Sequence, residues 1–538
     1  MKKISLFIAI LAGASLFSCN KQLDLAPIDY YGSGSYWQNE SHVKSYLIGL
    51  HKNMRDVSWT HMMLFGEMRG GGVNNAGATI DGSAINYGDL VNQNLNVTSM
   101  GGVTNYGDYY GKITNCNLFI KKVTEAEFLS DANKAYYLGM GYGLRAFYFY
   151  DLYRVYGSIP LRTGIEVIEG VLDPEKLYME PSTCATVVAQ IKSDLEESYK
   201  QFGSANNFDP MGLGKDKNYW SKAATECLMA DFYLWISKVS QGDFKADASN
   251  LSAAKTHLNN VINNYGLGML DNFAKVLDAT NKNNKEIIYA VGFSETEATN
   301  SLGTFAYNTT TGMAYQKFYK ADGVTLFGDP LGLKGGTVMR NEHKLGLYTM
   351  FDNADTRRDA TFVPVYNAKD EWAAKGELAG LITSKNLGYM TNAGTWSFCG
   401  DFPYFRLSWC YLALAEIANM EGDNAAVVSN INKVRERAYG SKWNVATYGY
   451  TAGDFTQNEL AILREKDKEF IQEGHRWWDV RRMTLTKGGK ALVFCPEGNI
   501  DSTNPLLTDA EAYKLLWPLD KTLLSKDPAL KQTPGYDN

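Results

Sequence analysis

The segment EGHRWWDVRR, residues 473–482, combines side chains that could carry out chemistry. His475 and Asp479 are a possible base and acid, and Trp477 and Trp478 are a possible aromatic stacking surface. Adjacent residues on a helix point about 100° apart, however, so the two indoles cannot form one flat platform. Three arginines lie within three residues of Asp479 and favour an ionised, paired carboxylate. We therefore interpret the segment as a structural junction between a long helix and a short one.

Other catalytic signatures are missing from the chain. It contains no G-x-S-x-G, no H-E-x-x-H and no nucleotide-binding loop. Its six histidines are scattered, and the spacing between His51 and His61 matches no metal motif. A glycoside hydrolase needs two carboxylates about 5–10 Å apart, and 59 acidic residues leave that alternative open. We predict no enzymatic activity, no cofactor and no bound metal, with a glycoside hydrolase as the alternative.

The amino-terminal residues resemble a bacterial lipoprotein signal. Lys2 and Lys3 precede an uncharged apolar run that ends at Phe17, which is shorter than the about 20 residues of a spanning helix. The run closes in LFSC, which is similar to a lipobox although Phe17 is bulkier than usual. We predict that residues 1–18 are a signal peptide, that Cys19 is acylated, and that a lipid anchor is the chain's only attachment to the membrane.

The composition fits an exported globular protein. A chain of 538 residues with 45% hydrophobic content can bury a large core, and a net charge of −6 without basic blocks argues against a nucleic-acid partner. Apart from Cys19, the six cysteines show no C-x-x-C spacing, which favours buried thiols over a disulfide framework. Aromatic residues make up 13% of the chain, an enrichment that suits stacking surfaces as well as cores.

Helical periodicity dominates both ends of the chain. Apolar side chains recur three and four residues apart in segments 133–157, 181–202, 219–240, 250–266, 405–440 and 457–483. Gly157 ends the first segment as a C-cap glycine would, EGDN divides the fifth into two helices, and Gly474 interrupts the last. Small residues at the expected crossings favour tetratricopeptide-like helix pairs, although no strict repeat of about 34 residues is visible. We predict a mainly α fold with a helical scaffold at about 36–266 and 401–485.

Two stretches between and within these helical regions are irregular. Residues 66–105 are rich in glycine and asparagine, and residues 267–400 contain only short strand-like runs such as 285–293. Long irregular segments in a compact protein are usually functional or disordered, and the helical flanks and aromatic side chains favour function. We predict few short strands and a loop-rich, ligand-binding insertion at about 267–400, within a single domain of residues 19–538.

Four segments near the carboxyl end resemble the SusD/RagB family of outer-membrane lipoproteins. They are FRLSWCYLALAEIAN, NINKVRERAYG, ILREKDKEFIQEGHRWWDVRRM and LWPLDKTLLSKDPALKQTPGY. The stretches LDLAPIDYYGSGSYW, YYGKITNCN and LRAFYFYDLYRVYGSIPL are similar to the family's earlier blocks and follow the family's order. The resemblance therefore covers nearly the whole chain.

The resemblance implies a fold, a ligand class and a partner. The expected fold is a set of tetratricopeptide-like helix pairs that supports an irregular binding face. Family members capture glycans, or sometimes peptides, at the surface of Bacteroidota cells. The chain is accordingly expected on the exterior of the outer membrane, as a lid over a SusC-like TonB-dependent transporter that receives an oligosaccharide.

The expected ligand site lies in two stretches outside the helical pattern, the first of which begins with Trp59 just before the glycine-rich residues. A neutral sugar has hydroxyls at its edges and C–H groups on its faces, so its site needs aromatic planes, polar side chains and little net charge. The resemblance implies contacts from the loop before the Y-x-x-I-x-x-x-N segment that starts at Tyr110, and from the central insertion. The candidates are Trp59, Arg69, Asn74, Asn75, Asp81, Tyr87 and Asn96, followed by Tyr307, Tyr315, Trp372, Tyr389 and Trp396.

Among these candidates Trp396 is the strongest, because glycines on either side favour an exposed ring and no helical stripe includes it. An oligopeptide is the alternative ligand, since aromatic and asparagine-rich loops can also hold an extended backbone.

Overall fold

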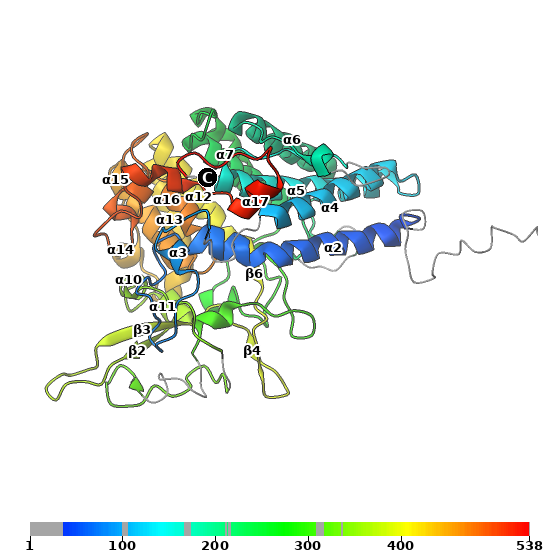
Figure 1. The fold of residues 1–538 in the computed structure, drawn as a ribbon. Helices are drawn as coiled ribbons and strands as arrows, with labels where there is room; N and C mark the ends of the chain where they lie inside the picture. The colour runs from blue at the N-terminus through cyan, green and yellow to red at the C-terminus, as the bar shows by residue number, and fades with distance from the viewer. Residues whose placement is uncertain are drawn as a thin grey trace, which may run out of the picture.

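The computed structural model describes residues 36–98, 106–165, 174–209, 212, 217–307, 317–334 and 337–536. The predicted signal peptide and Cys19 lie outside these ranges. Helices form an upper layer in Figure 1, and a loop-rich layer with short strands lies below it. Helix α2 (Glu40–Trp59) runs along the border between the two layers. Among the described residues, no helix combines the length and the apolar character that a bilayer span needs.

The longer helices flank the strand-bearing part of the chain. They are α2, α4 (Tyr106–Glu125), α5 (Asp131–Tyr156), α6 (Cys184–Phe202), α7 (Lys222–Lys238), α8 (Leu251–Asn264), α12 (Leu407–Glu421), α13 (Asn424–Tyr439) and α15 (Phe455–Glu469). The shorter helices are the π-helix η1 (Thr60–Glu67), α3 (Gly88–Val91), α10 (Leu345–Thr349), α11 (Thr356–Thr361), α14 (Val445–Tyr448), α16 (Arg476–Arg482) and α17 (Lys521–Lys526). Short 3-10 segments occupy Pro174–Leu177, Ala248–Asn250, Phe273–Lys275, Leu302–Phe305, Gly440–Lys442, Leu492–Phe494, Pro496–Gly498 and Asp509–Leu515.

The strands form antiparallel pairs in the loop-rich layer. They are β1 (Ile287–Val291) with β6 (Phe402–Arg406), β2 (Phe362–Tyr366) with β3 (Leu378–Thr383), and β4 (Tyr389–Met390) with β5 (Trp396–Ser397). Their short lengths agree with the prediction of few strands in this part of the chain.

The helices pack as neighbouring pairs. Helices α4 and α6 both pack against α5, α7 packs against α8, and α12 contacts both α8 and α13. Gly157, with φ +80°, follows α5, and Gly422, with φ +78°, separates α12 from α13. Positive φ favours glycine because it has no Cβ. The breaks predicted from the sequence are therefore at the ends of these helices, and the mainly α fold is confirmed.

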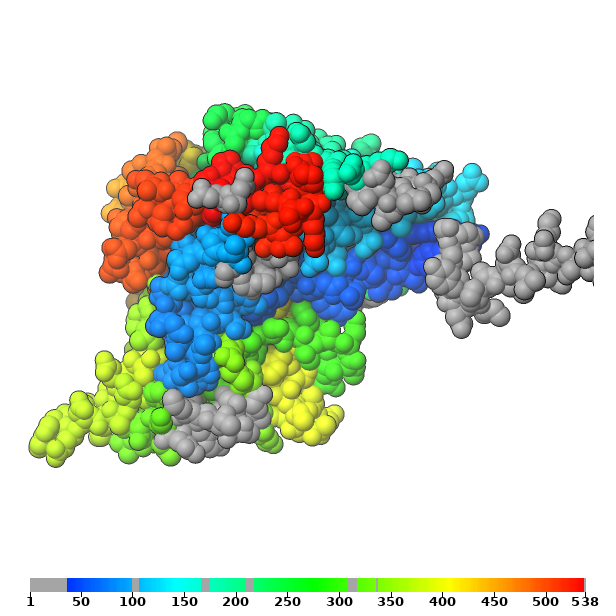
Figure 2. All heavy atoms as spheres, in the orientation of Figure 1, coloured from blue at the N-terminus to red at the C-terminus, as the bar shows by residue number. Residues whose placement is uncertain are grey.

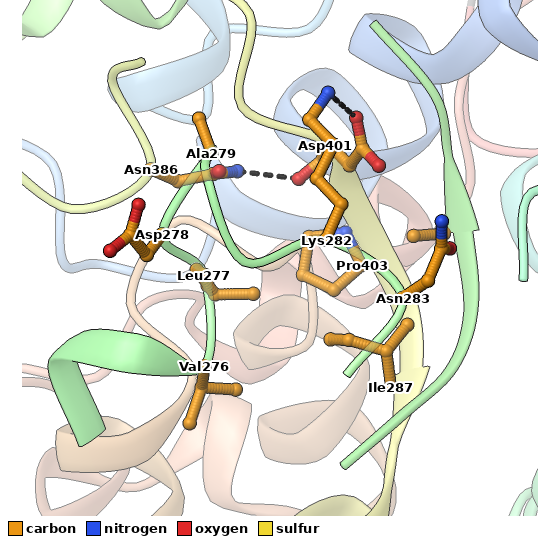
Figure 3. Close-up of a pocket in the computed structure, with 11 residues that line it drawn as sticks. Val276, Leu277, Asp278, Ala279, Lys282, Asn283, Ile287, Asn386, Asp401 and Pro403 are labelled. Carbon is orange, nitrogen blue, oxygen red and sulfur yellow. Dashed lines mark hydrogen bonds and ion pairs between the residues drawn. The ribbon is translucent and has the colours of Figure 1, made fainter. Parts of the chain in front are cut away.

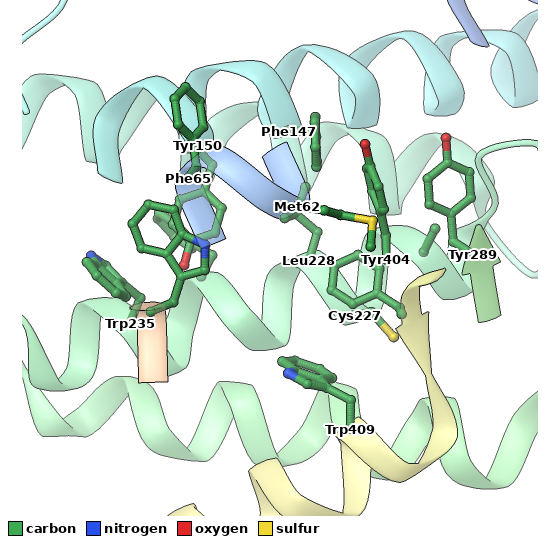
Figure 4. Close-up of a cluster of buried hydrophobic side chains, with 14 of the residues drawn as sticks. Met62, Phe65, Phe147, Tyr150, Cys227, Leu228, Trp235, Tyr289, Tyr404 and Trp409 are labelled. Carbon is green, nitrogen blue, oxygen red and sulfur yellow. The ribbon is translucent and has the colours of Figure 1, made fainter. Parts of the chain in front are cut away.

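Aromatic side chains fill much of the helical core. Tyr137, Phe147 and Tyr150 of α5 are at most 2% exposed. Figure 4 shows Phe147 and Tyr404 together between the helices, and their rings stack with centroids 5.5 Å apart. Because each buried aromatic ring removes about 150–250 Å² from water, much of the aromatic excess stabilises the core. The six described cysteines are also buried, and none of them is paired.

Segment 473–482 is a structural junction between α15 and α16. Gly474, with φ +76°, lies against η1, where a Cβ on Gly66 would come within 1.9 Å of the Gly474 carbonyl oxygen. Trp477 and Trp478 are 0% and 4% exposed, so both pack inward. Burial lowers the pKa of His475 to about 4, and this ring is neutral at neutral pH. The buried tryptophans therefore cannot stack on a ligand, and the buried histidine cannot act as a solvent-accessible base.

The charges around this junction form buried ion pairs, both within α16 and between different elements. Asp479 accepts hydrogen bonds from Lys466 at 2.8 Å and from Arg482 at 2.7 Å. Lys466 and Arg482 also bind Glu416 of α12, at 2.8 and 2.9 Å. Asp479 is therefore paired as predicted, but α15 and α12 supply part of the network that the local sequence did not show.

A second buried cluster joins the loop-rich layer to the helices. Glu469, at the end of α15, binds Arg406 of β6 at 2.5 Å and Arg357 of α11 at 3.1 Å, and it also pairs with Arg437 of α13. All four side chains are at most 2% exposed. Burying ionised groups is costly unless they are paired, so this cluster fixes how the two layers meet.

Candidate functional site: a groove beneath α2

Helix α2 has two different faces. Its buried face consists of Val43, Leu47, Leu50, Met54 and Val57. A second stripe, at spacings of three and four residues, contains Ser45, Ile48, Lys52, Arg55 and Trp59. At about 100° per residue the two stripes lie roughly 160° apart, so α2 packs on the core with one face and presents the other to the loop-rich layer.

The second stripe lines a groove. One hollow of about 660 Å³ lies between the stripe and residues 282–297, and an adjoining hollow of about 510 Å³ surrounds Trp59. Lys52, Arg55, Phe293 and Glu297 line both hollows, so the two form one continuous groove. Each volume lies within the range of about 300–1,000 Å³ that is usual for small-molecule sites.

The walls combine apolar planes with hydroxyl groups. The Trp59 side chain is half-buried against the core, and Ile48 is 49% exposed. Thr299 and Ser301 are exposed and line the same hollow as Trp59. A ligand with an apolar face and polar edges therefore finds complementary groups on both walls.

The charged side chains of the groove are paired with one another. The pairs are Lys52 with Asp56 at 2.8 Å, Arg55 with Glu297, and Lys282 with Asp401 at 2.5 Å. The hydrogen bond from Arg55 holds the pKa of Glu297 below its usual value, so this carboxyl is ionised at neutral pH. The groove is consequently polar, and the described residues that line it carry three positive and three negative groups in balance.

Asp401 holds the floor of the groove in place. It accepts hydrogen bonds from the Lys282 ammonium at 2.5 Å, the Phe293 amide at 3.0 Å and the Asn218 side chain at 3.3 Å. Figure 3 shows Lys282 and Asp401 beside a second, small cavity of about 20 Å³. Pro403 of β6 and Ile287 also line this cavity. A space of this size holds about one water molecule, so the ligand-sized volume lies on the α2 side.

Trp59 is the predicted site residue that the structure places in the groove. It is the last residue of α2, whereas we expected it outside the helices. Sequence reasoning missed Lys52 and Arg55, which line the groove beside it. Their spacing of seven and four residues from Trp59 was the available signal, because such spacings put side chains on one helical face.

Arg69 is a correction to the predicted site. Its side chain is fully buried, and it donates to the side-chain oxygen of Gln93 at 2.8 Å and to the carbonyl of Lys514 at 2.6 Å. Its guanidinium also lies 4.0 Å from the centre of the Trp477 ring. Arg69 thus links the first irregular stretch to the carboxyl-terminal segment and offers no surface to a ligand.

The other candidates of the first stretch lie on a surface loop. Asn75 is exposed, and Tyr87 adopts a left-handed backbone conformation with φ +58° before α3. Asp81 accepts hydrogen bonds from Thr79 and Ser83 that close a local turn. Asn96 similarly accepts hydrogen bonds from the backbone and side chain of Thr98.

This loop packs against the central insertion. The Asn74 amide donates to the Glu342 carbonyl at 2.7 Å, and the Asn86 amide donates to the Arg340 carbonyl at 2.8 Å. Figure 2 shows the first stretch, in blue, against the green and yellow insertion. The two irregular stretches therefore meet, although none of Asn75, Asp81 and Tyr87 lines the α2 groove.

The predicted site residues of the insertion lie in separate parts of the structure and do not form one site. Trp372 is 91% exposed in the turn between β2 and β3, and this hairpin projects away from α2 in Figure 1. Trp396 is half-buried and packs against the core from β5, which corrects the expectation of an exposed ring. Tyr307 is buried and donates its hydroxyl to Asp329. Tyr389 is part of β4, and Tyr315 lies outside the described residues.

Metal chemistry finds no support in the described part of the chain. No cluster of three or more His, Cys, Asp or Glu side chains in those ranges has the geometry to hold a metal ion. The histidines that raised the question serve the core: His51 accepts a hydrogen bond from the Trp220 amide at 2.8 Å, and His61 contacts Asp151 at 2.7 Å.

The sequence and the fold both match a known protein family. The SusD family model matches residues 379–536, which include all four carboxyl-terminal segments described above, and a SusD-like model described as "Starch-binding associating with outer membrane" matches residues 38–234. A solved SusD superfamily protein from Bacteroides fragilis NCTC 9343 is 53% identical, covers 93% of this chain and 100% of its own, and superposes with a TM-score of 0.88. The chain belongs to the SusD family.

Further SusD-family relatives extend over the same length. NanU of B. fragilis is 30% identical, covers 96% of this chain and 100% of its own, and has a TM-score of 0.79. The SusD-like protein P38 of Formosa agariphila is 23% identical over 99% of each chain. The predicted family is therefore confirmed, and with it the tetratricopeptide-like helical scaffold that SusD proteins share.

Proposed function

We propose that this SusD-family protein is a non-catalytic, cell-surface glycan-binding lipoprotein. It captures oligosaccharides in the α2 groove and delivers them to a SusC-like TonB-dependent transporter in the outer membrane. The observation that carries the proposal is the groove itself, in which Trp59, exposed hydroxyls and balanced charges meet in one ligand-sized space. The match to a family model described as starch-binding supports the same ligand class.

The walls of the groove suit the two kinds of surface on a sugar. A pyranose ring can lie with its C–H face on the indole of Trp59, which is half-buried and therefore held in place. Its hydroxyls can then exchange hydrogen bonds with Thr299, Ser301 and the charged pair of Arg55 and Glu297. A peptide remains the alternative ligand, because the same groups can bind backbone amides and carbonyls.

The charges of the groove argue against glycoside hydrolysis. A general acid must hold a proton at the working pH, which normally requires a raised carboxyl pKa. The pKa of Glu297 is instead lowered by Arg55, and Asp56 and Asp401 are each paired with a lysine. With its pKa lowered, Glu297 pairs with a cation and does not supply a proton.

Calorimetric titration with a panel of neutral oligosaccharides tests the proposal. We expect saturable binding without release of reducing ends, and Trp59→Ala should weaken it by about 1–3 kcal/mol, a usual loss for a stacking anchor. Trp59→Tyr should retain most of the affinity because it keeps an aromatic plane. Trp372→Ala is the matched control, since it removes a tryptophan that lies outside the groove.

Two results would contradict this proposal. Saturable binding of peptides without any binding of glycans would favour the alternative ligand. Steady release of reducing ends by the wild type, abolished by Glu297→Gln or Asp401→Asn, would establish an enzyme. Melting temperatures of all variants separate lost binding from lost folding.

The anchor and the partner form a separate part of the proposal. The lipobox-like LFSC sequence, the family match to outer-membrane association and the SusD fold support a mature chain of residues 19–538, tethered through Cys19 on the outer face. Co-purification after extraction in mild detergent tests the transporter partnership. Consistent elution of the lipoprotein alone, with the transporter present in the same extract, would contradict it.

A further inference from the structure

The cations of the α2 groove are engaged by carboxylates of the groove itself. We propose that the ion pair between Arg55 and Glu297 determines specificity by admitting uncharged oligosaccharides and disfavouring acidic ones. This inference rests on the proposed glycan-binding function and narrows its ligand class.

The pair spans the groove at the point where the two hollows join. Arg55 comes from α2, and Glu297 comes from a tight turn in which the backbones of Ser294 and Ala298 hydrogen-bond to each other. Both residues line both hollows. A chain of sugar units that runs along the groove must therefore pass this pair.

The geometry keeps Arg55 directed at Glu297. The Arg55 side chain is 16% exposed and donates a second hydrogen bond to the Gly292 carbonyl at 3.4 Å, whereas Glu297 is 65% exposed. The restrained cation thus lies beneath the solvent-facing carboxylate. A ligand that approaches from solvent meets the negative group first.

Among the described residues that line the groove, the other charges do not provide an unpaired cation in place of Arg55. Asp56 binds Lys52 at 2.8 Å and lies 3.6 Å from Lys112, and Lys282 is held by Asp401. To bind one of these cations, a carboxylate on the ligand would have to displace the groove carboxylate that already pairs with it. The displaced carboxylate would then lie next to the ligand's negative charge without a cation of its own. Hydroxyl groups carry no such penalty, because they can donate to Glu297 and accept from Arg55 while the pair stays intact.

The charge pattern therefore predicts a ratio of affinities. The probes are maltoheptaose and laminariheptaose together with the same chains oxidised to carboxylates at C6, which differ from their parents in charge but not in length or linkage. For the series that binds, the wild type should prefer the neutral chain by about tenfold or more, because like-charge contacts oppose the acidic one. Added salt should reduce this preference, since it screens exposed charges.

Glu297→Gln is the decisive variant, because it releases Arg55 while it keeps the shape of the side chain. We expect the preference for the neutral chain to fall at least fivefold, or to reverse, through a gain in affinity for the oxidised chain. Glu295→Gln is the matched control, since it removes the same charge from an exposed residue of the same turn that does not line the groove. This control should leave the preference unchanged.

The outcomes separate the inference from the function on which it rests. An unchanged preference in Glu297→Gln, an equal change in Glu295→Gln, or a wild type that favours the oxidised chains would overturn the inference alone. Binding of neither series, neutral or oxidised, by a folded wild type would overturn the glycan-binding proposal for these chains and the inference with it.

Discussion

Glu469→Gln should strongly destabilise the protein, because it removes the charge at the centre of a buried cluster. Glu469 contacts Arg406 at 2.5 Å, Arg357 at 3.1 Å and also Arg437, and the four side chains are at most 2% exposed. The amide of glutamine keeps the shape and some of the hydrogen bonds but does not neutralise the arginines. Their charges would then be buried without a full set of partners.

The magnitude follows from how such clusters respond to the loss of one partner. Two unit charges about 4 Å apart interact by about 4 kcal/mol at an effective dielectric constant near 20. Three such contacts do not add up fully, because Glu286 and Glu473 still pair with these arginines and the lost carboxylate no longer needs to be desolvated. A loss of about 3–5 kcal/mol in the free energy of unfolding is therefore expected.

Urea unfolding followed by tryptophan fluorescence measures this loss. The matched control is Glu421→Gln, which breaks the exposed pair between Glu421 and Lys255 and should cost at most about 1 kcal/mol. Equal stabilities of the two variants, both within about 1 kcal/mol of the wild type, would refute the view that this cluster stabilises the contact between the layers.

The same cluster predicts a dependence of stability on pH. Burial alone would raise the pKa of Glu469, but attraction to Arg437, Arg406 and Arg357 outweighs it and holds the pKa well below the usual value. Its contribution is therefore fully present above the unfolded pKa of about 4.3 and is lost as the pH falls through the folded value. Below about pH 4.3 the wild type should lose stability more steeply than Glu469→Gln.

Two further predictions concern the junction and the anchor. Trp478→Ala should destabilise the protein by about 3–5 kcal/mol, because Trp478 is 4% exposed and packs edge-on against Trp235 at 5.9 Å; an unchanged melting temperature with lost glycan binding would instead place this tryptophan in the ligand site. Cys19→Ala should abolish labelling by a palmitate analogue in intact cells, and labelling that persists in this variant would rule out the predicted lipidation.

The helical scaffold could be predicted because its signals are local. The apolar stripe of α5 and the glycine at its end, Gly157, predicted that helix, and the EGDN segment predicted the break between α12 and α13. Pairing across the fold was not predictable in the same way. Asp194, for example, is 2% exposed and binds Arg145 at 2.6 Å, a partner that no local pattern indicates.

The site was only partly predictable for the same reason. Composition predicted a ligand site among aromatic and polar side chains outside the helical pattern, and of these candidates Trp59 lines the groove. The sequence did not show that Arg69 would be buried under the carboxyl-terminal segment, or that Glu297 would face Arg55 across the groove. Those contacts depend on how distant segments pack, which periodicity and composition do not specify.

A crystal structure of the protein with a bound oligosaccharide tests the central claim most directly. We predict a sugar ring against the indole of Trp59, with hydroxyls within hydrogen-bonding distance of Thr299, Ser301 or Arg55. A sugar bound on the loop of residues 74–87 or on the hairpin that carries Trp372, with the α2 groove empty, would contradict it.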